Sequence, residues 1–324
     1  MPTHARGRVL PSRIVTDRHR REEPDEKGPT GLYTSIEGVR RGLAGLRTAE
    51  SDAAGRAFEP DPTDVFIATY PKCGTTWTQQ IVHSLRTRGD QDYEDIGDVV
   101  PWLESCLDLE QDPYAEQRAE PRAFKTHFHA GEVPSGGRYI NVVRDPRSVL
   151  VSFYRFFEGW YFVPGSIGVD AFADQFFLSG SRSGRYWDHV VAWWARRSEA
   201  DTLLLDYETM RADPERAVRT IAAFVGFGEE EDRIRIAVEQ SSLAYMRAND
   251  DKYDDKRLRR YRNAACRLPR EAGGNKVGGE ESARSVVDVS PRILDALEEA
   301  WRSIVTPKTG LADYEALRQA MAAR

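Results

Sequence analysis

The sequence predicts an α/β fold in which a parallel sheet is flanked by helices. Three stretches, beginning at residues 65, 138 and 202, each combine a short apolar run, a turn and a segment with helical spacing. Strands that alternate with helices in this way are typical of parallel sheets with right-handed crossovers. The chain has 324 residues and is 40% hydrophobic, which is enough to fill one large core. We expect a partly ordered extension over residues 1–60 and a single domain over residues 61–324.

The first of the three units contains a loop suited to an anion. "VFIATY" is a continuous apolar run, typical of a strand covered on both faces. In "TTWTQQIVHSLRTR", Trp77, Ile81 and Leu85 recur at four-residue spacing, which indicates a helix with one core-facing stripe. The intervening "YPKCGTTW" leads from the carboxyl end of a strand into a helix N-terminus, where free N–H groups bind anions.

The lysine of this loop stands in an unusual place. A nucleoside-triphosphate loop reads G-x-x-x-x-G-K-[ST], with its lysine after two glycines. Here Lys72 precedes the single Gly74, so the loop predicts one phosphate-like group rather than a chelated triphosphate, and it specifies no metal ligand. The plain alternative is a turn made by Pro71 and Gly74 with a solvated Lys72.

The second unit, "RYINVVRDPRSVLVSFYRFF", follows the same plan. Its strand ends at Arg144, Asp145 is placed to cap a helix, and Pro146 fits the first helical position. Arg144 offers a bidentate fork for a phosphate. Ser152 lies on the helix face opposite the aromatic stripe, where by itself it would be an ordinary exposed serine.

The third unit, "TLLLDYETMRADPERAVRTIAAFVGFG", completes the pattern. We expect a strand up to Asp206, a connection through Tyr207, and a helix that begins with Asp213 and Pro214 and ends at Gly226.

A short alternating stretch, "FKTHF", supplies a candidate base. On a strand, Lys125 and His127 face one side, while Phe124 and Phe128 face the other. Packing the phenylalanines into the core therefore brings the lysine and the histidine to a cleft. The alternatives are a structural histidine, or a metal pair with His129. No Cys, Asp or Glu stands at ligand spacing nearby, which disfavours the metal.

Together, "YPKCGTTW", "FKTHF", "VVRDPRSVLVSFYRF", "LLLDYETM" and "EQSSLAYM" resemble segments of the cytosolic sulfotransferases, and the resemblance extends over roughly residues 64–301. It implies a sulfotransferase domain whose P-loop-like loop binds 3'-phosphoadenosine 5'-phosphosulfate (PAPS), with 3'-phosphoadenosine 5'-phosphate (PAP) as product. The cofactor-binding residues that it implies are Lys72, Cys73, Gly74, Thr75, Thr76, Trp77, Arg144, Ser152, Tyr207, Ser241 and Leu243. Near the C-terminus, the family has an Arg-Lys pair that binds the 3'-phosphate. The matching stretch here reads "RLPREAGGNKVGGEES", and the resemblance implies that Arg270, Lys276 or the backbone of the glycine run takes the place of that pair.

The resemblance also implies a reaction. The sulfuryl group passes in line to a hydroxyl of a small, apolar or aromatic acceptor, and His127 acts as general base. Lys72 and Lys125 neutralise charge, Ser152 restrains Lys72, and no metal is required. Two other functions stay open, an ATP-dependent phosphotransferase and a catalytically inactive nucleotide-binding module. The altered C-terminal segment, and Leu243 in place of the family's usual aromatic residue, keep the inactive module open.

Composition and charge limit the classes of partner that we expect this protein to bind. A net charge of −6 and a pI near 5.7 give no overall field for nucleic acid. The widely spaced Cys73, Cys106 and Cys266 indicate reduced thiols rather than a disulfide framework or a zinc site. The charged N-terminal stretch, residues 1–29, contains no apolar run with the length of a signal peptide or a membrane span. We therefore expect a cytoplasmic protein that acts on a small molecule, with its acceptor and oligomeric state not predicted.

Overall fold

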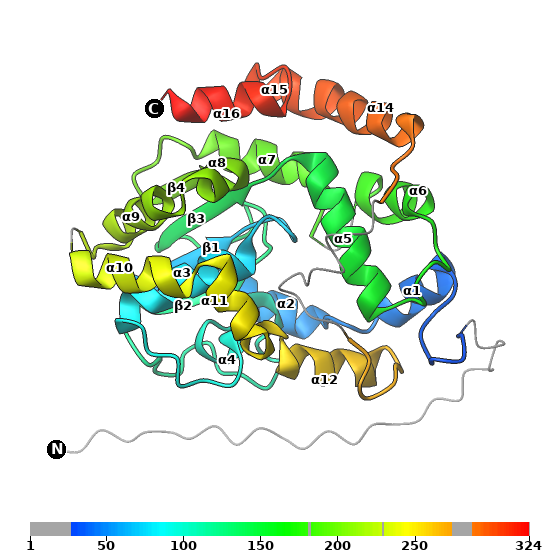
Figure 1. The fold of residues 1–324 in the computed structure, drawn as a ribbon, viewed down its shortest axis with the longest axis horizontal. Coiled ribbons are helices and arrows are strands. Elements are labelled where there is room, and N and C mark those ends of the chain that lie inside the picture. Colours follow the sequence, from blue (N-terminus) through cyan, green and yellow to red (C-terminus); the bar gives the residue numbers. More distant parts are fainter. Residues whose placement is uncertain (1–26, 181–182, 229, 274–286, 324) are drawn as a thin grey trace.

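A computed structural model describes residues 27–180, 183–228, 230–273 and 287–323. At its centre is a four-stranded sheet in the order β2-β1-β3-β4, in which all neighbouring strands are parallel (Figure 1). In this order the strands are Ala123–Thr126, Val65–Ala68, Arg138–Val143 and Thr202–Asp206. The predicted α/β fold, a parallel sheet flanked by helices, is confirmed.

Helices surround this sheet (Figure 1). The α-helices are α1 (Ile36–Leu43), α2 (Ala49–Arg56), α3 (Thr75–Thr87), α4 (Ile96–Val99), α5 (Pro146–Trp160), α6 (Val169–Phe172), α7 (Tyr186–Ala195), α8 (Tyr207–Ala212), α9 (Pro214–Val225), α10 (Glu231–Gln240), α11 (Leu243–Ala248), α12 (Lys256–Ala265), α14 (Pro291–Ala300), α15 (Thr306–Thr309) and α16 (Tyr314–Ala322). Shorter or wider helical turns are η1 (Leu103–Ser105), η2 (Ala173–Leu178), η3 (Asp250–Tyr253) and η4 (Trp301–Val305). In the described part of the chain, no helix is long and apolar enough to cross a membrane.

Side chains alternate along the buried strands. Val65 and Ile67 pack in one apolar cluster with the buried stripe of α3. Phe66, between them, packs in a second cluster with Phe124 and Phe128. This is the period of two that a pleated strand imposes, and it places both phenylalanines of "FKTHF" in the core, as predicted. The strand itself ends at Thr126.

Helix caps explain why the second predicted strand–helix unit is found as predicted and why the third differs from its prediction. The side chain of Asp145 accepts the N–H of Ser148 at 2.7 Å, and Pro146 opens α5, as predicted. The third unit contains an additional helix, because Asp206 accepts the N–H of Thr209 at 2.9 Å. Tyr207 is therefore the first residue of α8 rather than part of an open connection.

The N-terminal region is described from residue 27 onward. Ser35 and Thr48 cap α1 and α2. At Gly55 of α2, an added Cβ would lie 2.8 Å from Cα of Glu104 in η1, so α2 packs directly on the segment that precedes β2. Residues 1–26 lie outside the described part, so the partly ordered extension and its boundary at residue 60 stay predictions.

Parallel strands place their carboxyl ends at one edge of the sheet. The segments that follow β1, β2, β3 and β4 carry Lys72, His127, Arg144 and Tyr207, respectively. The fold therefore brings residues from four separate stretches of the sequence to the same edge.

Candidate active site

A cavity of about 1580 Å³ opens at this edge of the sheet. Its walls come from the β1–α3 loop, β2 and the segment before it, α5, the region from α8 to the start of α12, and the end of α1 with the segment after it. The predicted site residues that line it are Lys72, Gly74, Thr75, Thr76, Trp77, Lys125, His127, Arg144, Ser152, Tyr207, Ser241 and Leu243. Most of the predicted site is thus gathered in one place.

The loop before α3 approaches its surroundings closely. Gly74 has a φ of +99°, and an added Cβ would lie 3.0 Å from the ring of Tyr207. Only glycine meets both conditions without strain. The hydroxyls of Thr69 and Thr75 lie 2.5 Å apart, which ties the end of β1 to the first turn of α3. The N-terminus of this 13-residue helix thereby faces the cavity in a fixed position.

Two cations converge beside this loop. Arg144 donates from Nη1 to the carbonyl oxygen of Lys72 at 2.9 Å, and the Lys72 ammonium lies 4.5 Å from the centre of the Phe156 ring. Burial, together with the positive charges of Arg144 and Lys125, lowers the pKa of Lys72 to about 8. Positive charges held this close favour the binding of an anion between them.

Aromatic rings flank the same cations. The Arg144 guanidinium lies 4.2 Å from the centre of the Tyr207 ring. Trp77 meets Tyr207 edge to face, with centroids 5.7 Å apart. Tyr186 donates its hydroxyl to the carbonyl oxygen of Arg144 at 2.6 Å. The result is a positively charged corner with an aromatic surface beside it, which suits a nucleotide, because the cations can bind its phosphate and the rings can contact its base.

His127 is held as a neutral imidazole. Its Nδ1 lies 2.7 Å from the carbonyl oxygen of Thr69; because a carbonyl only accepts, Nδ1 carries the proton and Nε2 keeps its lone pair. Its backbone N–H donates to Glu104 at 2.7 Å. Burial lowers the pKa of His127 well below its usual value, and the charge of Lys125 lowers it further. The ring is therefore uncharged at neutral pH and able to accept a proton.

Lys125 lies beside His127 in the same cavity. Its side chain is buried, and its ammonium lies 4.5 Å from the centre of the Trp102 ring. Burial lowers the pKa of Lys125 to about 8, against the opposing effect of the Glu104 and Asp95 carboxylates. The lysine therefore carries its charge at neutral pH and begins to lose it in mildly alkaline solution.

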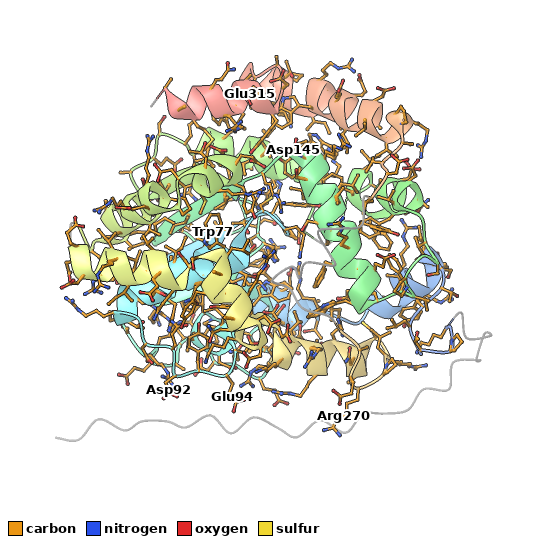
Figure 2. The ribbon with its side chains drawn as sticks, in the orientation of Figure 1. Trp77, Asp92, Glu94, Asp145, Arg270 and Glu315 are labelled. Carbon is orange, nitrogen blue, oxygen red and sulfur yellow. The ribbon has the colours of Figure 1, made fainter. Side chains whose placement is uncertain are left out.

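Two of the predicted residues in the described part of the chain, Cys73 and Arg270, do not line the cavity. Cys73 is fully buried in the core, and burial raises the pKa of its thiol to about 12, so only its backbone is available to a ligand. Arg270 is exposed and lies at the edge of the molecule, far from Trp77 (Figure 2). Its proposed phosphate contact therefore receives no support from the structure. Lys276 lies outside the described residues.

The metal alternative for the histidines also lacks a ligand set. The ring of His129 lies edge to face with that of His189, with centroids 5.7 Å apart. Among the described residues, no group of three or more His, Cys, Asp or Glu side chains is placed to hold a metal ion.

Part of the cavity wall was not predicted from the sequence. The cavity is also lined by Leu43, Leu46 and Arg47, which belong to the N-terminal region (residues 1–60), and by Asp255. The signal for the first two was present, since Val39, Leu43 and Leu46 recur at helical spacing. The aromatic residues that line the cavity are Trp77, Trp102, Phe153, Phe156, Phe157, Trp160, Tyr161 and Tyr207.

Comparison with known proteins gives the family. A family model described as "Sulfotransferase domain" matches residues 62–263. Human sulfotransferase 2A1 is 28% identical over 228 residues, which cover 66% of this chain and 77% of the relative. Rat sulfotransferase 1 family member D1 is 29% identical over 211 residues, 62% of this chain and 72% of the relative.

Solved structures share the fold. Mouse sulfotransferase SULT7A1 complexed with PAP superposes with a TM-score of 0.60 at 19% identity, covering 86% of this chain and 95% of that one. Retinol dehydratase in complex with androsterone and PAP has a TM-score of 0.57 at 20% identity, covering 85% and 88%. The family match spans more than half of the chain. This protein therefore belongs to the sulfotransferase family and is an enzyme that transfers the sulfuryl group of PAPS.

Proposed function

We propose that this sulfotransferase sulfates a hydroxyl of a small apolar or aromatic acceptor, with His127 as general base. The observation that carries the proposal is the meeting of a neutral His127 with Lys72 and Lys125 in one cavity. The rest of the wall is largely apolar, which favours an acceptor of the same kind. The apolar residues of this wall include Leu43, Leu46, Trp102, Val151, Phe153, Phe156, Phe157, Trp160 and Tyr161.

The proposed reaction moves one proton and one sulfuryl group. The acceptor oxygen attacks sulfur as Nε2 of His127 takes the hydroxyl proton. The bond from sulfur to the bridging phosphate oxygen breaks, and its electron pair stays on that oxygen. Lys72 and Lys125 offset the negative charge that develops there. A bound anionic donor also raises the pKa of His127, which makes the ring a better base once the donor is in place.

We assign the donor-binding residues from the resemblance to the cytosolic sulfotransferases, supported by their place in the cavity. We assign the first turn of α3, from Gly74 to Trp77, to the 5'-phosphosulfate, since a helix N-terminus favours an anion. Arg144 and Ser152 take the 3'-phosphate, and Tyr207 takes the base together with Trp77. Two more side chains extend this wall: Ser241, whose buried hydroxyl has no hydrogen-bond partner within the described chain, and the largely exposed Leu243.

Two further statements complete the proposal. The alternative of an inactive nucleotide-binding module is disfavoured, because the base and both lysines are present and face one cavity. We also propose that the enzyme works in the cytoplasm. Cys73, Cys106 and Cys266 are all free and buried, as expected in a reducing compartment.

An acceptor assay tests this function. The enzyme is incubated with PAPS and either 2-naphthol or glucose, in EDTA, and release of PAP is measured. We expect the apolar phenol to raise PAP release at least about tenfold over the glucose reaction, since each buried apolar group contributes transfer free energy. Transfer to glucose alone would contradict the apolar acceptor. A rate that needs added magnesium would contradict the metal-free mechanism.

A further inference from the structure

We propose that Asp255 is a positioning residue that holds Lys125 charged and in place beside His127. The inference rests on the proposed role of Lys125 in sulfuryl transfer. Asp255 immediately precedes α12, in a stretch between the segments that resemble the sulfotransferases. It nevertheless lines the same cavity as the lysine and the histidine.

The two side chains form a buried ion pair. Oδ2 of Asp255 lies 3.5 Å from Nζ of Lys125, and their side chains are only 7% and 9% exposed. Charges this deeply buried are poorly screened by solvent, and removing one of them takes away a direct partner of the other. The Trp102 ring contacts the same ammonium. Lys125 is thus placed between a carboxylate and an aromatic ring.

Asp255 is itself held in position by the docking of α12. The backbone N–H of Lys256 donates to Asp95 at 2.8 Å, and its ammonium donates to the carbonyl oxygen of Glu94 at 3.0 Å. Arg257 pairs with Asp98 at 3.3 Å. Asp255 has a φ of +46°, a conformation that non-glycine residues keep only where their surroundings impose it. The start of α12 therefore presents the carboxylate to the lysine.

The charges around Lys125 set the direction of its response to pH. The charged and titratable groups that face it come from several elements and loops: Asp255, Glu104, Asp95, Lys72 and His127. Burial lowers the pKa of Lys125 to about 8, whereas a nearby carboxylate favours the charged form. Because Asp255 lies 3.5 Å from the Lys125 ammonium, we expect removal of its charge to lower the pKa of Lys125, so that the lysine loses its proton at lower pH.

The pH dependence of kcat/KM tests this role. In the wild type, we expect activity to fall as pH rises through about 8, the pKa of both Lys72 and Lys125. In Asp255→Asn we expect this alkaline limb to move down by about one pH unit. Asparagine keeps the shape of the side chain and is among the residues that adopt positive φ. Asp255→Gly, in which positive φ is unstrained, should give the same displacement and serves if the asparagine variant does not fold.

A matched control removes the same charge from the surface. Asp251 lies four residues earlier, and its side chain is 71% exposed, so Asp251→Asn should leave the limb at its wild-type pH. Asp255→Glu, which retains the charge, should also keep the limb near that pH. An unchanged limb in a folded Asp255→Asn or Asp255→Gly variant would overturn the inference, as would an equal displacement in Asp251→Asn. A wild type that shows no turnover with any acceptor would contradict the proposed function instead.

Discussion

Replacing His127 with asparagine is expected to lower kcat by about 100- to 10,000-fold, the range that a general base contributes. The substitution removes Nε2, which keeps its lone pair because Nδ1 donates to the carbonyl oxygen of Thr69. An asparagine amide can still donate to that oxygen, so the loop before α3 should stay in place. PAP affinity should therefore change little. PAP release measures the first quantity, and calorimetric titration with PAP measures the second.

His129 provides the control for this experiment. It lies two residues further along, is half-buried, and does not line the cavity. His129→Asn should retain wild-type kcat. If His127→Asn lost PAP binding together with turnover, the histidine would be a structural residue and the base would have to be another group.

Replacing Lys72 with methionine should produce the second large effect. Methionine has a similar length but no charge, and it leaves Arg144 and Lys125 as the cations nearest the phosphate loop. Loss of one preorganised charge at a reacting centre lowers kcat by about 100- to 1,000-fold. We also expect weaker donor binding, because the corner between Lys72 and Arg144 loses half of its formal charge. Steady-state kinetics with PAPS at fixed acceptor concentration measure both quantities.

A surface lysine separates this local effect from a change in net charge. Lys308 is exposed in α15, and Lys308→Met should leave both kcat and the KM for PAPS unchanged. Retention of wild-type kcat by Lys72→Met would contradict the assignment of Lys72 to the transferring group, whatever happens to the KM.

The fold could be predicted because its signals are local. The apolar runs of β1, β3 and β4 are each followed by a helix with a readable stripe, and Asp145–Pro146 and Asp213–Pro214 mark two helix starts. The strand order β2-β1-β3-β4 was not predicted. It depends on pairing between β1 and the much later β2, which no short stretch of sequence specifies. The start of α8 at Tyr207 depends on one side-chain cap and was not predicted from the sequence.

The candidate site also has a part that could be predicted from short motifs and a part that depends on long-range contacts. Lys72 and Trp77 belong to one short motif, and Lys125 and His127 to another, so their neighbourhood follows from local structure. Asp255 reaches Lys125 from 130 positions away, in a charged stretch that would ordinarily be solvated.

The contribution of the N-terminal region to the cavity wall could not be predicted for a related reason. Arg47 is buried because it pairs with Asp52 at 2.8 Å and lies 3.7 Å from Glu104. Glu104 reaches it from the segment before β2, and that long-range partner cannot be read from the sequence around Arg47.

Calorimetric titration with PAP, 5'-AMP and Mg·ATP tests the central claim most directly. If the cavity is a PAPS site with Arg144 and Ser152 at the 3'-phosphate, PAP should bind at least about tenfold more tightly than 5'-AMP, since charge-assisted hydrogen bonds to one phosphate contribute about that much. Mg·ATP should bind no better than 5'-AMP. Equal affinity for PAP and 5'-AMP, or a preference for Mg·ATP, would contradict the assignment of this cavity.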